Sequence, residues 1–215
     1  MKYLILAVAL MFGSIANAAT LNMTFSTTVD ASAFGGGTSE AFSASLNFSD
    51  QLTDTNTNLV LGIYSDANIS GKFSIGSETL SFGGGGIFVL NLSNLDQIGF
   101  SVQTSQPDNS ITGTFLGNAV SRFSFTIGEV AASSTVTPNL LLSDVIPSAG
   151  FSYTTTETIG ASISAGTDFN KNVTVVGPAT LSIQAAPVVP LPASSPLLIA
   201  GLGALGIARR RKTAA

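Results

Sequence analysis

Residues 42–48 read FSASLNF, and this heptapeptide decides the fold class. Its first, third, fifth and seventh residues are Phe, Ala, Leu and Phe, whereas Ser, Ser and Asn lie between them. In an extended chain, successive side chains point to opposite faces, so one face of this segment is apolar and the other carries hydroxyl and amide groups. The pattern predicts a β-strand with one buried and one exposed face.

The same alternation recurs at four other places, and no long amphipathic helical pattern competes with it. The apolar positions of these segments are Leu21, Met23 and Phe25; Ile98, Phe100 and Val102; Phe123, Phe125 and Ile127; and Ile159, Ala161 and Ile163. Turn-forming residues separate the segments, for example at 35–37, 65–68, 83–86 and 107–109. The sequence therefore predicts one all-β domain, a β-sandwich or jelly-roll-like fold of about 10–12 short strands.

Three further runs are continuously apolar and interrupt the alternation. They cover residues 59–64, 87–92 and 173–176. Continuous apolar runs are typical of strands that are covered on both faces. We expect these three segments to be such strands.

The composition excludes several classes of site. The 215 residues include no Cys and no His, which removes disulfides, thiol chemistry, the Ser-His-Asp triad and the usual zinc ligands. Only 9% of the residues are charged, against about 25% in typical soluble domains. Between the two ends, three basic residues face twelve acidic ones, a formal charge of −9. We therefore expect no nucleic-acid partner, because nothing there neutralises phosphates.

One loop has the oxygen-rich pattern of a cation site. Asp54, Asn56 and Asn58 alternate as in a calcium loop, but the sixth position is Leu59 instead of Gly and the twelfth is Ser65 instead of Glu. A polar hairpin loop is the competing interpretation. Calcium is thus a weak candidate, and we expect no other metal and no cofactor.

No catalytic constellation is recognisable. A glycosidase with two carboxylates remains formally open, since it needs only two acids at a suitable separation. The sequence does not show which two of its acidic residues would lie at that separation. The expectation is a protein without enzymatic activity.

The N-terminus has the organisation of a signal peptide. A positively charged start at residues 1–3 precedes an apolar run at 4–12, and Ala16 and Ala18 provide the small residues that signal peptidase accepts. We expect residues 1–18 to be removed during export.

The C-terminus has three consecutive parts. They are a proline-containing motif at 189–193, an apolar segment at 194–208 and a basic cluster at 209–212. In single residues, the motif is Val189, Pro190, Leu191, Pro192 and Ala193, and the cluster is Arg209, Arg210, Arg211 and Lys212. The order resembles the PEP-CTERM sorting signal in its VPLPA variant, with Leu191 where the core motif has Glu. A sortase signal of the LPxTG type is a minor alternative.

The resemblance implies a route for the protein. PEP-CTERM signals are processed by an exosortase, a membrane protease of Gram-negative bacteria that produce exopolysaccharide. It implies a transient anchor in the inner membrane through a helix at 194–208, cleavage near 189–193, and release to the cell surface or beyond. The basic cluster would remain cytoplasmic and stop transfer.

These features divide the chain into a signal peptide (1–18), an all-β exported domain (19–187) and a sorting signal (188–215). We expect the domain to have a structural or adhesive role at the surface or in a biofilm matrix, with self-association or exopolysaccharide as its contacts. The alternative is a secreted carbohydrate-binding module. The sequence offers it few aromatic platforms, since the domain has no Trp and its only tyrosines are Tyr64 and Tyr153.

Overall fold

The computed structural model of the protein describes residues 19–92, 95–130, 144–155, 160–165 and 171–186. In these ranges it contains fourteen strands and one short 3₁₀ helix. The elements are β1 (Thr20–Asp30), η1 (Ser32–Phe34), β2 (Glu40–Ser49), β3 (Leu61–Ser65), β4 (Ser70–Ile75), β5 (Glu78–Gly83), β6 (Gly86–Leu92), β7 (Leu95–Gln103), β8 (Ser110–Thr112), β9 (Thr114–Phe115), β10 (Asn118–Val130), β11 (Ser152–Thr155), β12 (Gly160–Ala165), β13 (Thr174–Val175) and β14 (Ala179–Ala185).

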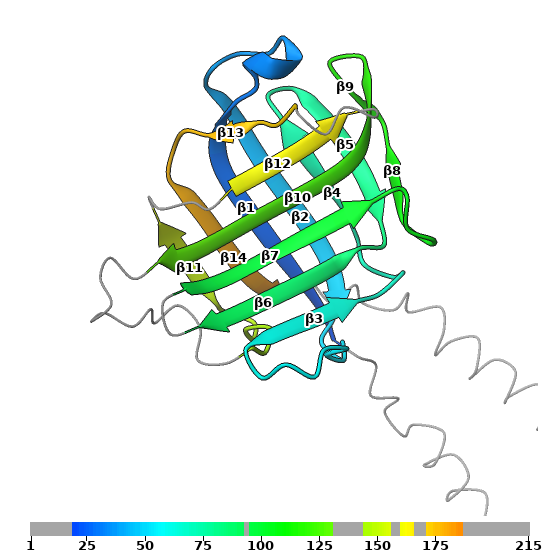
Figure 1. The fold of residues 1–215 in the computed structure, drawn as a ribbon, viewed down its shortest axis with the longest axis vertical. Coiled ribbons are helices and arrows are strands. Elements are labelled where there is room, and N and C mark those ends of the chain that lie inside the picture. The colour runs from blue at the N-terminus through cyan, green and yellow to red at the C-terminus, as the bar shows by residue number, and fades with distance from the viewer. Residues whose placement is uncertain (1–18, 93–94, 131–143, 156–159, 166–170, 187–215) are drawn as a thin grey trace, which may run out of the picture.

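The strands form two antiparallel sheets. Sheet A has the order β11-β14-β1-β2-β4-β5-β8, with β13 paired to β1, and sheet B has the order β12-β10-β7-β6-β3, with β9 paired to β10. Figure 1 shows sheet B in front of sheet A, with the strands of the two sheets crossing. The predicted β-sandwich is confirmed. The strand number exceeds the expected ten to twelve because β8, β9 and β13 are pairings of only two or three residues.

The alternating segments place their apolar residues between the sheets. In β2, Phe42, Ala44, Leu46 and Phe48 are all buried, as are the predicted positions of β1, β7 and β10. The fourth predicted set lies in and beside β12, whose side chains are outside the described part of the structure. The period of two in the sequence therefore defines the core wherever side chains are described.

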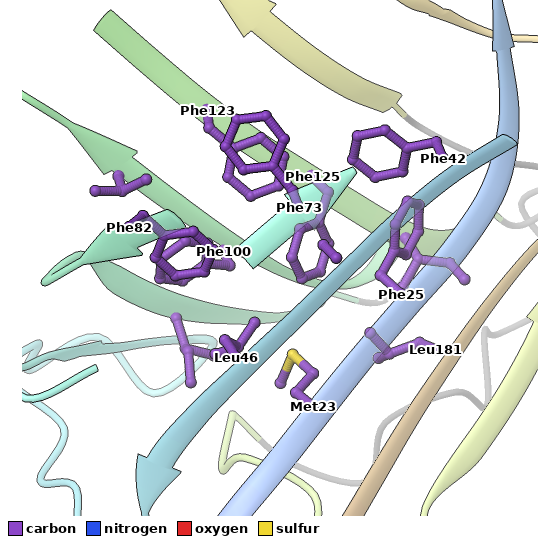
Figure 2. Packing of buried hydrophobic residues seen from close by; sticks show 14 of the residues in the cluster. Met23, Phe25, Phe42, Leu46, Phe73, Phe82, Phe100, Phe123, Phe125 and Leu181 are labelled. Carbon is purple, nitrogen blue, oxygen red and sulfur yellow. The ribbon is translucent and has the colours of Figure 1, made fainter. Parts of the chain in front are cut away.

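Phenylalanine rings join the two sheets. Phe73 of sheet A and Phe123 of sheet B stack with centroids 4.0 Å apart and planes at 6°. Phe25 and Phe125 repeat this arrangement at 4.7 Å and 14°. Figure 2 shows these rings in the centre of the core. Because each pair has one ring from each sheet, stacking contributes directly to the cohesion of the sandwich.

The outward face of sheet A carries hydroxyl and amide groups. They bond across the strands: Asn22 Nδ2 donates to Ser45 Oγ at 3.0 Å, and the Oγ atoms of Thr24 and Ser182 lie 2.7 Å apart. Uncharged polar groups thus cover most of this face of the domain, with Lys72 among them. They account for a low charged fraction in a protein with an extensive polar surface.

The continuously apolar runs differ from the expectation. In β6, Ile87 and Val89 are buried, whereas Phe88 and Leu90 point away from the core and remain partly exposed. Leu59 precedes β3 and is 89% exposed. No second layer covers the outer face of these strands in the described part of the chain, because each sheet packs with one face only. In the third run, Val176 is 52% exposed. The expectation of strands covered on both faces is therefore wrong, and the outer face of sheet B is partly apolar.

Candidate functional site

An open groove of about 690 Å³ crosses strands β3, β6 and β7 on the outer face of sheet B. We call it the β3–β7 groove. Leu61, Ile63 and Phe88 form its apolar floor, and residues 65–67 and 106–109 line its sides. The floor residues alternate along their strands with buried residues, which shows that they project outward. The volume is within the range of about 300–1,000 Å³ that is common for ligand sites.

Phe88 is the aromatic residue of this floor. It pairs with Ile63 on β3 and with Gly99 on β7. A Cβ atom at position 99 would collide with the Phe88 ring and with the carbonyl oxygen of Phe125. The ring therefore extends over the backbone of Gly99. Any larger residue at position 99 would exclude the ring from this place.

The loop between β3 and β4 forms one side of the groove. Its backbone is tied to the β5–β6 turn, since Asp66 N donates to Gly85 O at 3.3 Å and Gly84 N donates to Ile69 O at 2.7 Å. The Oδ1 atom of Asp66 accepts hydrogen bonds from Asn68 N and Asn68 Nδ2 at 2.8 and 2.9 Å. This Asx turn holds the Asp66 carboxylate in place at the groove.

The loop between β7 and β8 forms another side. Gln106 N donates to Gln103 O at 3.1 Å, and Asn109 Nδ2 donates to the same oxygen at 3.3 Å. Asp108, at the tip, has a φ of 68°, a conformation that Asp and Asn adopt more readily than other residues with a side chain. The loop thus presents one carboxylate and two side-chain amides to the groove, and Gln103 at the end of β7 adds a third amide.

The groove combines an apolar floor with hydrogen-bonding groups and two carboxylates. None of its lining residues is Lys or Arg. Arg122 of β10 pairs with the lining residue Gln103 and is itself outside the lining. Carbonyl, amide and carboxylate groups beside an aromatic ring suit a ligand that is rich in hydroxyl groups and has one apolar face.

The calcium candidate lies in the loop before β3. Asp54 Oδ1 accepts from Asn56 N and Ile63 N at 2.8 and 2.9 Å, and Asn56 Oδ1 accepts from Asn58 N at 3.1 Å. The Oδ1 of Asn58 in turn accepts from Val60 N. The alternating oxygens thus form consecutive Asx turns. No group of three or more acidic residues that could hold a metal ion occurs in the described ranges.

Tyr64 connects the same region to the segment that begins at Asp144. Its hydroxyl donates to Asp144 O at 3.0 Å. Burial raises the pKa of Tyr64 above 10.0, and the negative charges of Asp54 and Asp144 add to this effect. The phenol therefore stays protonated in the folded protein well into the alkaline range.

The other predicted site residues lie outside the described ranges. These are Ala16 and Ala18 of the signal peptide, the motif at 189–193 and the basic cluster at 209–212. The predicted helix at 194–208 is outside them as well. Among the described residues, no helix is long and apolar enough to span a membrane.

Sequence reasoning missed the β3–β7 groove, although its signals were present. The sequence predicts turns at 65–68 and 107–109, and residues 65–67 and 107–109 line the groove. The runs at 59–64 and 87–92 were interpreted as doubly covered strands. In a sandwich of two sheets, a continuous apolar run instead indicates an apolar outer surface.

Comparison with known proteins identifies the C-terminal segment. Residues 188–212 match the family model of the PEP-CTERM protein-sorting motif, which confirms the predicted resemblance; the VPLPA variant stays a prediction. The motif indicates an exported protein that is transiently anchored in the membrane and targeted to an exosortase. No curated protein and no solved structure matches the chain.

Proposed function

We propose that the protein is an exosortase-processed component of the cell surface or extracellular matrix, in which the β-sandwich has a structural or adhesive role without enzymatic activity. The observation that carries the proposal is the sorting motif at 188–212, which follows directly after the last strand of the domain. A sorting signal that directs the chain to the outer surface is here attached to a sandwich with a hydroxyl-rich face. This combination fits a component that acts by binding to neighbouring surface or matrix molecules.

The intact mass of the protein recovered from the surface of its producer tests the route. We expect a chain that lacks residues 1–18 and all residues after the cleavage site near 189–193, including the basic cluster at 209–212. A mass that still includes the basic cluster would overturn the processing proposal. Incubation with oligosaccharides of known length tests the absence of enzymatic activity, since shortened products would reveal a glycosidase.

A second candidate function is carbohydrate binding, and the β3–β7 groove favours it. Sugars present apolar C–H faces together with hydroxyl groups, and the groove offers the Phe88 ring beside Gln103, Gln106 and Asn109. Affinity electrophoresis in gels that contain the producer's own exopolysaccharide measures binding. Retarded migration of the wild-type protein, lost in Phe88→Ala, would support this function. Self-assembly without any retardation would favour the structural role instead.

A further inference from the structure

We infer that the β3–β7 groove selects glycans that carry no acidic groups and binds sugars with free amino groups most tightly. This inference rests on the carbohydrate-binding function proposed above. The inference concerns the charge of the ligand. The lining of the groove indicates this charge more clearly than it indicates which sugar is bound.

The first step concerns the charges in the groove. Asp66 and Asp108 both line it, from the β3–β4 and the β7–β8 loops, and no lining residue is basic. A carboxylate or sulfate group on the ligand would therefore meet like charges, whereas an ammonium group would meet opposite ones. Screened interactions with two carboxylates near a surface amount to an affinity difference of about three- to tenfold.

The second step concerns the fixed position of these charges. The Asp66 carboxylate is held by its Asx turn to Asn68, and the β7–β8 loop is held by the bonds from Gln106 and Asn109 to Gln103 O. A charge on an ordered backbone is already in place when a ligand arrives, so little ordering entropy opposes the contact. The charge preference is thus built into the loops that shape the groove.

The remaining described cations do not reverse this preference. Lys72 projects among hydroxyl groups on the outer face of sheet A, where it lines a different hollow. Arg122 is on the same face as the groove, opposite Gln103 and one strand beyond the lining. A ligand that fills the groove contacts the residues that line it, which include both carboxylates but not Arg122. Lys171 is exposed, three residues before β13 of sheet A, and it is also outside the lining. Arg122 is therefore the described cation that pairs with a lining residue, and the test includes it.

The structure offers a variant that removes the charges and keeps the shape. Asp66→Asn retains Oδ1, the atom that accepts both bonds from Asn68. Asp108→Asn suits a residue at φ 68°, since Asn adopts this conformation readily. The double variant D66N/D108N should therefore fold normally, which its thermal unfolding midpoint verifies. Asp50→Asn, in the exposed turn after β2 and outside the lining, is the matched control for the loss of one carboxylate.

The experiment measures the binding of three oligosaccharides of equal length to the full chain by titration calorimetry. They are chitosan, chitin and polygalacturonate oligomers, which present ammonium, neutral acetamido and carboxylate groups. At mildly acidic pH and low salt we expect chitosan to bind about three- to tenfold more tightly than chitin, and polygalacturonate to bind most weakly. D66N/D108N should abolish the preference for chitosan, whereas D50N and Arg122→Gln should retain it.

The outcomes separate the inference from the function on which it rests. Binding of chitin without a preference for chitosan, or tighter binding of polygalacturonate, overturns the charge inference and leaves carbohydrate binding intact. A preference that survives in D66N/D108N also overturns it. Failure of all three oligomers and of the producer's own polysaccharide to bind would overturn carbohydrate binding itself. If the double variant did not fold, the ranking of the three oligomers by the wild-type protein would still decide the matter.

Discussion

Replacing Phe123 by Leu should destabilise the sandwich far more than the same change at Phe34. Phe123 is fully buried and stacks on Phe73 across the two sheets at 4.0 Å, and four other rings lie with centroids 5.8–6.2 Å from its own. Phe34 is also buried, but it meets only the Phe115 ring, edge-on at 5.2 Å, among the described ring pairs. The two substitutions remove the same atoms. They differ in how many rings lose their partner.

The magnitude follows from the ring pairs. One stacked aromatic pair contributes about 1 kcal/mol beyond its buried area, and an apolar change of similar volume costs about 1 kcal/mol in packing. The looser pairs around Phe123 add roughly one more. Phe123→Leu should thus lower the free energy of unfolding by about 3 kcal/mol and Phe34→Leu by about 1–2 kcal/mol. Against a typical total of about 5–15 kcal/mol, the first loss is substantial.

Equilibrium unfolding in urea measures both losses, with the slope checked for constancy. A double-mutant cycle with Phe73→Leu and Phe123→Leu isolates the stacked pair and should give a coupling of about 1 kcal/mol. Equal destabilisation by Phe123→Leu and Phe34→Leu, or a coupling below about 0.3 kcal/mol, would refute the idea that ring stacking joins the sheets. Burial alone would then account for the stability.

Three further predictions concern the surroundings of the core. Tyr64→Phe removes the hydrogen bond to Asp144 O and should lower the free energy of unfolding by about 1 kcal/mol. Because the pKa of Tyr64 is raised above 10.0 in the folded state, the wild type should lose stability as the pH rises above that value. Unfolding curves of the variant at alkaline pH should show less of this loss. Gly99→Ala introduces a Cβ atom that collides with the Phe88 ring, so it should lower the thermal midpoint and weaken glycan retention together; unchanged values of both would contradict the packing described for the groove floor. Millimolar calcium should leave the thermal midpoint unchanged, because Asp54 Oδ1 already accepts two backbone bonds, and a rise that a chelator reverses would instead establish a calcium loop.

The core could be predicted from the sequence because its signal is local. In residues 42–48 and 123–127, the period of two assigns each side chain to a face without any knowledge of the partner strand. Periodicity does not encode the pairing of distant segments. The sheet that each strand joins and the contact of Phe73 with Phe123 depend on that pairing. The C-terminal motif was recognisable because its three parts are contiguous.

The sequence gives single parts of the groove but not the groove itself, because its parts come from segments that are distant in the chain. Asp66 and Asp108 belong to different loops, and only the pairing of β3 with β6 and of β6 with β7 brings those loops to one face. Phe88 could be identified as part of an apolar run, but its outward orientation becomes evident only when no layer is found outside sheet B among the described elements. Local sequence thus specified the inside of the domain better than its surface chemistry.

The pairing of β1 with β14, the first and last strands of the described residues, has a consequence for export. β1 lies between β2 and β14 in sheet A, with Leu21 opposite Ala185 and Ala186 N bonded to Thr20 O at 2.8 Å. When the chain crosses the membrane with its N-terminus first, the edge of β1 that pairs with β14 stays unpaired until β14 has also crossed. The sorting motif begins immediately after that strand. We therefore expect sheet A to be completed at about the time when the sorting signal reaches the membrane, so that the chain crosses before this part of the domain can close.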